Sequence, residues 1–285
     1  MTGQVAHADG TQGEAPILWE RSGPGVVTIT LNRPHRGNGV VPELVEEFLG
    51  VLDELEPDPG VRVAIVTGAG QQFSAGADLV EFERHLTDEL GRTHEPYNVR
   101  VLLPLTHRIT ASRLIFIAAV NGAATAGGLD LALACDLRIA SEKARLGETY
   151  VNVGLAPGNG GSWFLPRLVG SGIAAELALT GDLVDAQRAL EIGLVNRVVP
   201  HEQLLPTAQE LADKIAAKPW RALEATKQAL QAAWQLDLGA ALKASYWTTM
   251  SLQHTDDVLE AVRARLQRRD PVFNRDVDDR SPRRY

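Results

Sequence analysis

The sequence predicts an α/β protein in which strands and helices alternate up to about Pro200 and helices alone follow. Two nearly continuous apolar runs, 61–68 and 114–122, are typical of parallel strands covered on both faces. A strand and an amphipathic helix precede the first run, which gives the strand–helix–strand order of right-handed βαβ crossovers. With 285 residues, 45% of them hydrophobic, the chain is long enough to bury one sizeable core.

Local patterns predict each element in turn. In 26–31, valine, isoleucine and leucine alternate with threonine, the period of two expected of a strand with one buried face. Apolar residues recur at helical spacing over 41–56, with Pro42 near the start, and predict a helix. The charged segment 73–113 is expected to contain helical stretches broken around Pro96 and Pro104, and to form a mobile lid.

Four parts are expected along the chain: a disordered tail over 1–16, a core domain over 17–200, a helical subdomain over 201–275 and a tail over 276–285. The first sixteen residues contain neither Lys nor Arg and no apolar block, which argues against a secretory signal. The longest apolar run, 114–120, is far shorter than the roughly 20 residues of a membrane helix. We therefore expect a soluble globular protein.

Charge and cysteine content exclude several classes of function. The net charge is −8, and no run of like charge is long enough to suggest a nucleic-acid or membrane partner. A single cysteine, Cys135, gives no disulfide framework and no thiolate cluster, which fits a reducing cytoplasm. The nucleophile elbow, the P-loop and the dinucleotide-binding fingerprint are absent from the sequence. His201 begins a zinc-like motif that lacks its second histidine, so we expect no metal.

Two glycine-bearing loops follow the predicted buried strands. In "FSAGAD", Gly76 allows a sharp turn that leaves the Ala77 N–H pointing outward. In "ATAGGLD", Gly127 and Gly128 begin an apolar helix whose first N–H groups lack intrahelical partners. Two such groups facing one point would form an oxyanion hole for a thioester enolate or a tetrahedral adduct. Taken separately, each loop is more readily explained as an ordinary tight turn than as part of an oxyanion hole.

Together and in this order, the motifs resemble those of a known family. They are "FSAGADL", "AAVNGAATAGGLDLALACDLRIASEKARLG", "GLAPGNGGSWFLPRLVG", "ALTGDLVDAQRALEIGLVNRVVP" and "RRDPVFNRD". Over 18–275 the chain resembles the enoyl-CoA hydratase/isomerase family, the crotonase superfamily. The resemblance implies a crotonase-like spiral of ββα turns with a C-terminal helical region that builds homotrimers or hexamers. It also implies an acyl-CoA substrate, with coenzyme A as part of that substrate and no separate cofactor, and oxyanion donors at Ala77 and Gly127.

The acid/base positions depart from the hydratase pattern. Typical hydratases carry two glutamates there, and this chain has Asp130 and Tyr150. Asp130 is expected to move a proton at the α- or γ-carbon of the substrate, or else only to cap its helix. Tyr150 is protonated at neutral pH and can donate a hydrogen bond or a proton. Glu148 would replace the missing base if the segment is extended, or else lie on the surface, and Asn159 is a further polar candidate.

The resemblance also suggests which residues bind the substrate. These are Ala75, Gly76, Asp78, Leu79 and Gly128, with Arg33 and Arg36 as candidate phosphate ligands. Val80 stands where a lysine is frequent in the family. One carboxylate suits double-bond isomerisation, or hydration assisted by Tyr150 or Glu148. The alternatives are retro-Claisen hydrolysis of a carbon–carbon bond in a β-dicarbonyl compound, and a family member without catalysis.

Overall fold

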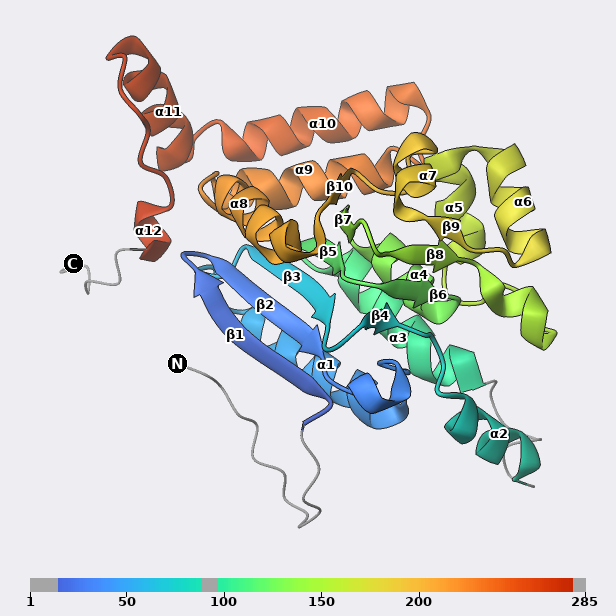
Figure 1. The fold of residues 1–285 in the computed structure, drawn as a ribbon. Coiled ribbons are helices and arrows are strands. Elements are labelled where there is room, and N and C mark those ends of the chain that lie inside the picture. The colour runs from blue at the N-terminus through green and yellow to red at the C-terminus, as the bar shows by residue number, and fades with distance from the viewer. Residues whose placement is uncertain (1–14, 89–96, 279–285) are drawn as a thin grey trace.

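A six-stranded sheet lies at the centre of the structure, a computed structural model that describes residues 15–88 and 97–278 (Figure 1). The first two strands form an antiparallel hairpin, and all further neighbours in the order β1-β2-β3-β5-β7-β10 are parallel. The strands are β1 (Ile17–Gly23), β2 (Val26–Leu31), β3 (Val63–Gly68), β5 (Ile115–Val120), β7 (Leu137–Ser141) and β10 (Arg197–Val199). The tail expected over 1–16 lies almost wholly outside the described residues, as does most of the one expected over 276–285.

A second, smaller sheet places the loops that matter for function. Its strands are β4 (Gln72–Ser74), β6 (Ala123–Thr125), β8 (Arg145–Gly147) and β9 (Val184–Asp185), in the order β4-β6-β8-β9. Each of β4, β6 and β8 follows a strand of the main sheet and leads into a helix, which is the expected ββα repeat. Because β4, β6 and β8 run parallel, the segments that leave their carboxyl ends lie side by side.

Helices cover both faces of the main sheet. One face packs against α1 (Pro42–Leu55), α3 (Tyr97–Ala111) and α4 (Gly127–Ala134), and the other packs against α8 (Leu204–Ala216). The remaining helices are α2 (Leu79–Thr87), α5 (Gly161–Val169), α6 (Ser171–Thr180), α7 (Ala186–Glu191), α9 (Trp220–Ala232), α10 (Leu238–Leu252), α11 (Asp256–Leu266) and α12 (Arg275–Asp278), with 3₁₀ turns η1 (Pro34–Arg36), η2 (Thr149–Val153) and η3 (His201–Gln203). None of the helices within the described residues is long and apolar enough to cross a membrane.

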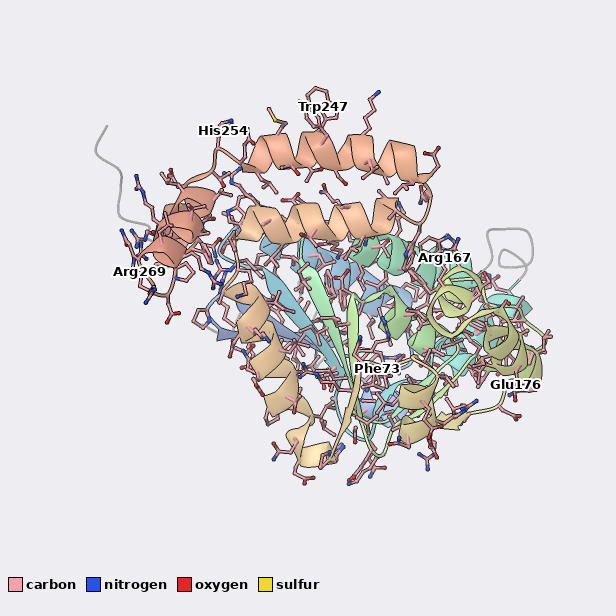
Figure 2. The ribbon with its side chains drawn as sticks, turned by 90° about the horizontal axis from the view of Figure 1, so that it is seen from above. Phe73, Arg167, Glu176, Trp247, His254 and Arg269 are labelled. Carbon is pink, nitrogen blue, oxygen red and sulfur yellow. The ribbon has the colours of Figure 1, made fainter. Side chains whose placement is uncertain are left out.

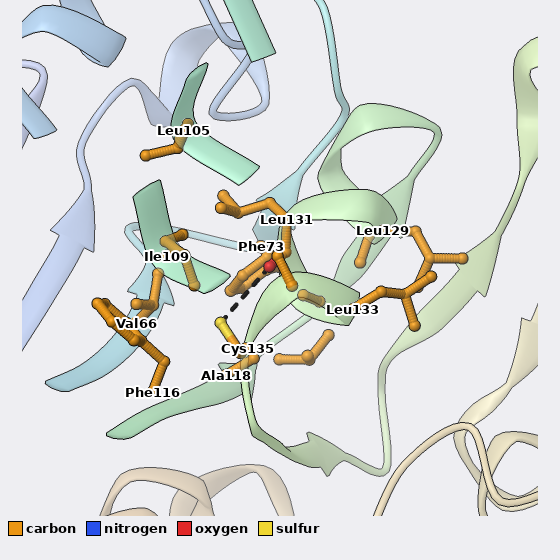
Figure 3. Close-up of a cluster of buried hydrophobic side chains, with 14 of the residues drawn as sticks. Val66, Phe73, Leu105, Ile109, Phe116, Ala118, Leu129, Leu131, Leu133 and Cys135 are labelled. Atoms are coloured by element: carbon orange, nitrogen blue, oxygen red, sulfur yellow. Dashed lines mark hydrogen bonds between the residues drawn. The ribbon is translucent and has the colours of Figure 1, made fainter. Parts of the chain in front are cut away.

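Helix α4 lies within the larger apolar cluster and is buried along its whole length (Figure 3). Leu129, Leu131 and Leu133 point to different sides of this helix and all meet apolar neighbours, which explains why every residue of α4 except Asp130 is apolar or glycine. Cys135 ends the helix, and its thiol donates to the Leu131 carbonyl oxygen at 3.4 Å. Burial raises the pKa of this thiol to about 12, so it stays protonated.

The expectation of a mobile lid is wrong for α3. This helix is part of the core, because Leu102, Leu105 and Ile109 are buried. It also continues through Pro104 without the predicted break. Pro104 has no N–H, so the carbonyl four residues earlier lacks its helical hydrogen bond. Pro104 lies on the exposed side of the helix, where water can bond to that carbonyl instead. Pro96, the other expected break, lies outside the described residues.

A buried lysine joins the C-terminal helices to the core. Lys227 of α9 donates from Nζ to the carbonyl oxygens of Ile109, at 3.2 Å, and Leu114, at 2.7 Å. The same Nζ lies 3.0 Å from Asp136 Oδ2, and only 3% of the lysine side chain is exposed. All three ammonium protons therefore have partners supplied by other elements.

Replacing this lysine should weaken the protein measurably. Lys227→Met keeps the apolar stem but leaves two carbonyls without this donor and Asp136 without its cationic partner, so we expect the free energy of unfolding to fall by about 2–3 kcal/mol. Urea unfolding followed by circular dichroism measures this change. The exposed Lys214→Met of α8 is the matched control, and equal midpoints for the two variants would contradict the role given to Lys227.

Candidate active site

Two glycine-bearing loops meet where β4 and β6 end. A Cβ on Gly76 would lie 2.9 Å from the backbone N of Gly127, and a Cβ on Gly128 would lie 2.1 Å from the carbonyl O of Ser74. Gly76 also has φ of +85°, which favours glycine. Gly76 and Gly128 are therefore required because two backbones approach each other closely at these positions.

Each loop contains one backbone N–H, that of Ala77 or of Gly127, with no backbone acceptor outside its own element among the residues that the structure describes. Val40 forms a parallel bridge with Ala77 by donating its N–H to the Gly76 carbonyl O at 2.7 Å and accepting from Asp78 N–H at 3.2 Å. The N–H of Ala77 itself thus points away from this bridge. Gly127 is the first residue of α4, so its N–H has no intrahelical acceptor and stands at the positive end of the helix.

A cavity of about 440 Å³ opens in front of these loops. Its lining includes Ala77, Ala126 and Tyr150, which places it beside both loops. The remaining walls are mostly apolar. The large apolar or aromatic residues are Leu79, Val80, Phe82, Tyr97, Leu102, Val153 and Leu155. The small or polar residues are Arg36, Ala75, Asp78, Thr125 and Thr149. Such walls suit an acyl chain.

Asp130 and Tyr150 lie together, but only Tyr150 reaches the cavity. Asp130, on the first turn of α4, is wholly buried, and its Oδ2 accepts a hydrogen bond of 2.5 Å from the Tyr150 hydroxyl. The same hydroxyl oxygen accepts from Asn159 Nδ2 at 2.6 Å. The capping alternative for Asp130 is wrong, because the N-cap of α4 is Ala126 and no side chain bonds there.

Glu148 is a second wholly buried carboxyl, so the expectation of a surface residue is wrong. The segment is not extended either, since Tyr150 belongs to η2. Glu148 Oε1 and Asp130 Oδ1 both lie 2.3 Å from the point that a Cβ on Gly161 would occupy. Neither oxygen has another hydrogen-bond partner among the described residues, so a proton held between them satisfies both.

Burial and the repulsion between the two carboxyl groups give Asp130, Glu148 and Tyr150 different pKa values. Burial, together with the charge of Asp130, raises the pKa of Glu148 to about 9. Burial raises the pKa of Asp130 to about 6, and hydrogen bonds from Tyr150 and Glu148 oppose a larger rise. Burial and the nearby carboxylate also raise the pKa of Tyr150. At pH 7 the cluster therefore holds one carboxylate, Asp130, beside a neutral acid and a neutral phenol.

The two predicted phosphate ligands have different surroundings. Arg36 lines the cavity. The guanidinium of Arg33 instead lies 2.9 Å from Asp78 Oδ2 and also donates to the Gly39 carbonyl O. Asp78 in turn caps α2. Arg33 is therefore occupied in holding the segment next to Ala77.

Sequence reasoning missed some of the lining and most of the network. Tyr97 and Leu102 were missed because their segment was interpreted as a lid, although its buried apolar positions recur at helical spacing. Asn159 was noted only as a polar residue in a loop. Its contact with Tyr150 depends on how that loop folds back, and no local pattern reports this.

The comparisons agree on one family. The family model for enoyl-CoA hydratase/isomerase matches residues 21–276. The short-chain-enoyl-CoA hydratase of Clostridium acetobutylicum is 37% identical over 254 residues, which cover 89% of this chain and 95% of that protein. The 1,2-epoxyphenylacetyl-CoA isomerase of Escherichia coli is 36% identical over 252 residues, covering 87% and 95%. The crystal structure of an enoyl-CoA hydratase from Bacillus anthracis superposes with a TM-score of 0.85 at 38% identity, covering 90% of this chain and 98% of that one.

Proposed function

This chain belongs to the enoyl-CoA hydratase/isomerase family of the crotonase superfamily, and we propose that it moves a proton on an acyl-CoA thioester through an enolate. The Ala77 and Gly127 N–H groups hold the thioester oxygen as it gains negative charge. The observation that supports this proposal is the close approach of the Gly76 and Gly127 loops beside a cavity that Ala77, Ala126 and Tyr150 line. Preorganised donors of this kind stabilise an enolate more than its neutral parent.

The proton is passed through Tyr150. As the C–H bond breaks, its proton goes to the Tyr150 oxygen, the hydroxyl proton goes to Asp130, and the electron pair passes into the thioester carbonyl. Asp130 is therefore the final acceptor although it does not line the cavity. Return of a proton by the same route to a different carbon completes the reaction.

Double-bond isomerisation is the activity that the site supports best. Tyr150 is the one member of the Asp130, Glu148 and Tyr150 cluster that lines the cavity, and a shuttle of one proton between two carbons needs one such group. Hydration is the second candidate, because several relatives at 35–40% identity are named as hydratases. The retro-Claisen alternative gains no support from the relatives.

Labelled water distinguishes these activities. The purified protein is incubated with 2-enoyl-, 3-enoyl- and 3-hydroxyacyl-CoA thioesters in D₂O and, separately, in ¹⁸O-water, and the products are analysed by mass spectrometry. Isomerisation incorporates deuterium and no ¹⁸O, and hydration incorporates both. The absence of exchange and of conversion with every thioester would contradict the proposed function, and cleavage of free β-diketones would support the retro-Claisen alternative.

Activity should depend on pH through the two carboxyl groups. Below pH 6 Asp130 is protonated and cannot accept the relayed proton, so kcat/KM should rise with pH through an apparent pKa of about 6. It should fall again near pH 9, where Glu148 loses its proton and places a second charge against Asp130. Glu148→Gln should remove the fall of kcat/KM near pH 9 (the alkaline limb of the profile). The exposed Glu202→Gln should keep both the rise near pH 6 and the fall near pH 9. An alkaline limb that persists in Glu148→Gln would contradict this assignment.

We further propose a homotrimer or hexamer in the cytoplasm, with no cofactor beyond the coenzyme A of the substrate. The proposal of assembly is supported by α10, where Leu238, Leu242 and Trp247 are 75%, 62% and 63% exposed. Figure 2 shows Trp247 on the side of α10 that faces away from α9. Sedimentation equilibrium should give three or six times the chain mass of 30.8 kDa, and a monomer at micromolar concentration would contradict the proposal.

A further inference from the structure

Asn159 is a wholly buried amide at the far side of the proton-transfer pair. It lies in the loop between η2 and α5, and its Nδ2 donates to the Tyr150 hydroxyl oxygen at 2.6 Å. Its Oδ1 has no hydrogen-bond partner among the described residues. A buried, half-satisfied amide costs stability, so packing alone does not account for an asparagine at this position.

The hydrogen bonds of the Tyr150 hydroxyl leave one arrangement of its proton. A phenol oxygen carries one proton and two lone pairs. The carboxylate of Asp130 can only accept, so the hydroxyl proton lies toward Asp130 Oδ2. The N–H of Asn159 occupies one lone pair, and one lone pair remains. This oxygen lies 3.4 Å from the point that a Cβ on Gly127 would occupy, next to the predicted oxyanion donor.

We propose that Asn159 is a positioning residue for proton transfer: its amide N–H holds the Tyr150 oxygen so that the hydroxyl proton faces Asp130 and the remaining lone pair faces the cavity. This inference rests on the proposed function and deepens it. A network oriented in this way takes a proton from the substrate before it returns one. It therefore fits a thioester with an acidic C–H bond, such as a 3-enoyl thioester, as the starting substrate.

The Asn159 N–H also supports the negative charge that passes through Tyr150. As the hydroxyl proton leaves for Asp130, charge develops on the phenol oxygen, and a fixed donor stabilises it. The hydrogen bond from Asn159 to Tyr150 lowers the pKa of Tyr150 against the larger effect of burial, and the amide of Asn159 also lowers the pKa of Asp130 by hydrogen bonding to its carboxylate. The other groups facing this pair are Glu148 and the backbone of Gly161 at the start of α5.

Two substitutions of Asn159 test whether the hydrogen bond that it donates to Tyr150 is needed. Asn159→Leu removes the donor with a similar volume, and Asn159→Asp puts an acceptor in its place that competes for the Tyr150 proton. Asn152 provides the matched control, because its Nδ2 donates to the Gly181 carbonyl O at 3.1 Å, away from the network. Thermal unfolding of each variant checks the fold.

The first readout is the rate at which saturated and 3-enoyl-CoA thioesters exchange protons with D₂O. We expect both Asn159 variants to lower kcat about 100-fold, with KM within about threefold of wild type. In a Tyr150→Phe background, Asn159→Leu should have no further effect, because the asparagine acts through the hydroxyl. Wild-type kcat in folded Asn159→Leu, or an equal loss in the Tyr150→Phe background, would overturn the inference.

A second readout does not require turnover. Carboxyl ¹³C NMR of labelled aspartate follows the titration of Asp130 in the ligand-free protein. Asn159→Leu should move this midpoint to higher pH and Asn152→Leu should leave it in place, whereas an unmoved midpoint in both would overturn the inference. Absence of exchange in the wild type contradicts the proposed function instead, so the two failures are distinguishable.

Discussion

Asp130→Asn is expected to lower kcat about 1,000-fold while KM stays within about threefold of wild type. The amide has the shape of the carboxylate but cannot accept the proton that Tyr150 passes on. Its carbonyl oxygen can still accept the hydrogen bond from the Tyr150 hydroxyl, but a neutral amide does not take up the proton along that bond. Binding is preserved because Asp130 does not line the cavity.

Steady-state kinetics with the preferred thioester measure this effect. The exposed Asp53→Asn on α1 is the control, since that carboxylate pairs with Arg108 and lies far along the chain from the site. The variant should also stay folded at pH 8, because a neutral amide is no harder to bury than a carboxylate. If Asp130→Asn kept a third or more of the wild-type kcat, the assignment of Asp130 as proton acceptor would have to be abandoned.

Gly128→Ala should damage activity and stability together. The new Cβ would lie 2.1 Å from the Ser74 carbonyl O, which is backbone and cannot rotate aside. The start of α4 must then move away from the end of β4, which separates the Gly127 N–H from the Ala77 N–H. Loss of one oxyanion donor lowers kcat by about 100-fold or more, and the overpacking lowers the free energy of unfolding by about 1–3 kcal/mol.

A second glycine gives the control for this substitution. Gly172 lies in α6, and a Cβ there would meet no atom within 4 Å. Gly172→Ala should therefore raise the free energy of unfolding by about 0.5–1 kcal/mol, because alanine favours the helix, and should leave kcat unchanged. Normal kinetics for Gly128→Ala would show that the two loops need not touch for catalysis.

Much of the fold was predictable because the relevant information is local. The apolar runs 61–68 and 114–122 contain β3 and β5, and the predicted helix over 41–56 coincides with α1. Strands covered on both faces must be apolar throughout, so their sequence reports their burial. The segment 73–113 was misinterpreted because it contains two helices of different character: α2 is charged and has no buried residue, whereas α3 buries an apolar face in the core.

The glycine loops of the candidate site could be predicted from the sequence, but the positions of its acidic side chains could not. Gly76 and Gly128 stand out in sequence because the close approach of two backbones excludes a Cβ there, and a Cβ on Gly127 would meet the Leu102 side chain at 2.3 Å. The burial of Glu148 and the position of Asp130 behind Tyr150 depend on α4, η2 and α5 meeting in space. Charged residues are usually exposed, so the sequence favoured a surface position for Glu148, and packing of three elements overrode that tendency.

The most direct test of the central claim is a crystal structure of the protein with an unreactive acyl-CoA thioester bound. The thioester oxygen should lie within hydrogen-bond distance, about 2.7–3.1 Å, of both the Ala77 and Gly127 nitrogens, with the α- or γ-carbon facing the Tyr150 hydroxyl. A thioester oxygen that contacts neither nitrogen, in a protein that still exchanges substrate protons with solvent, would contradict the account.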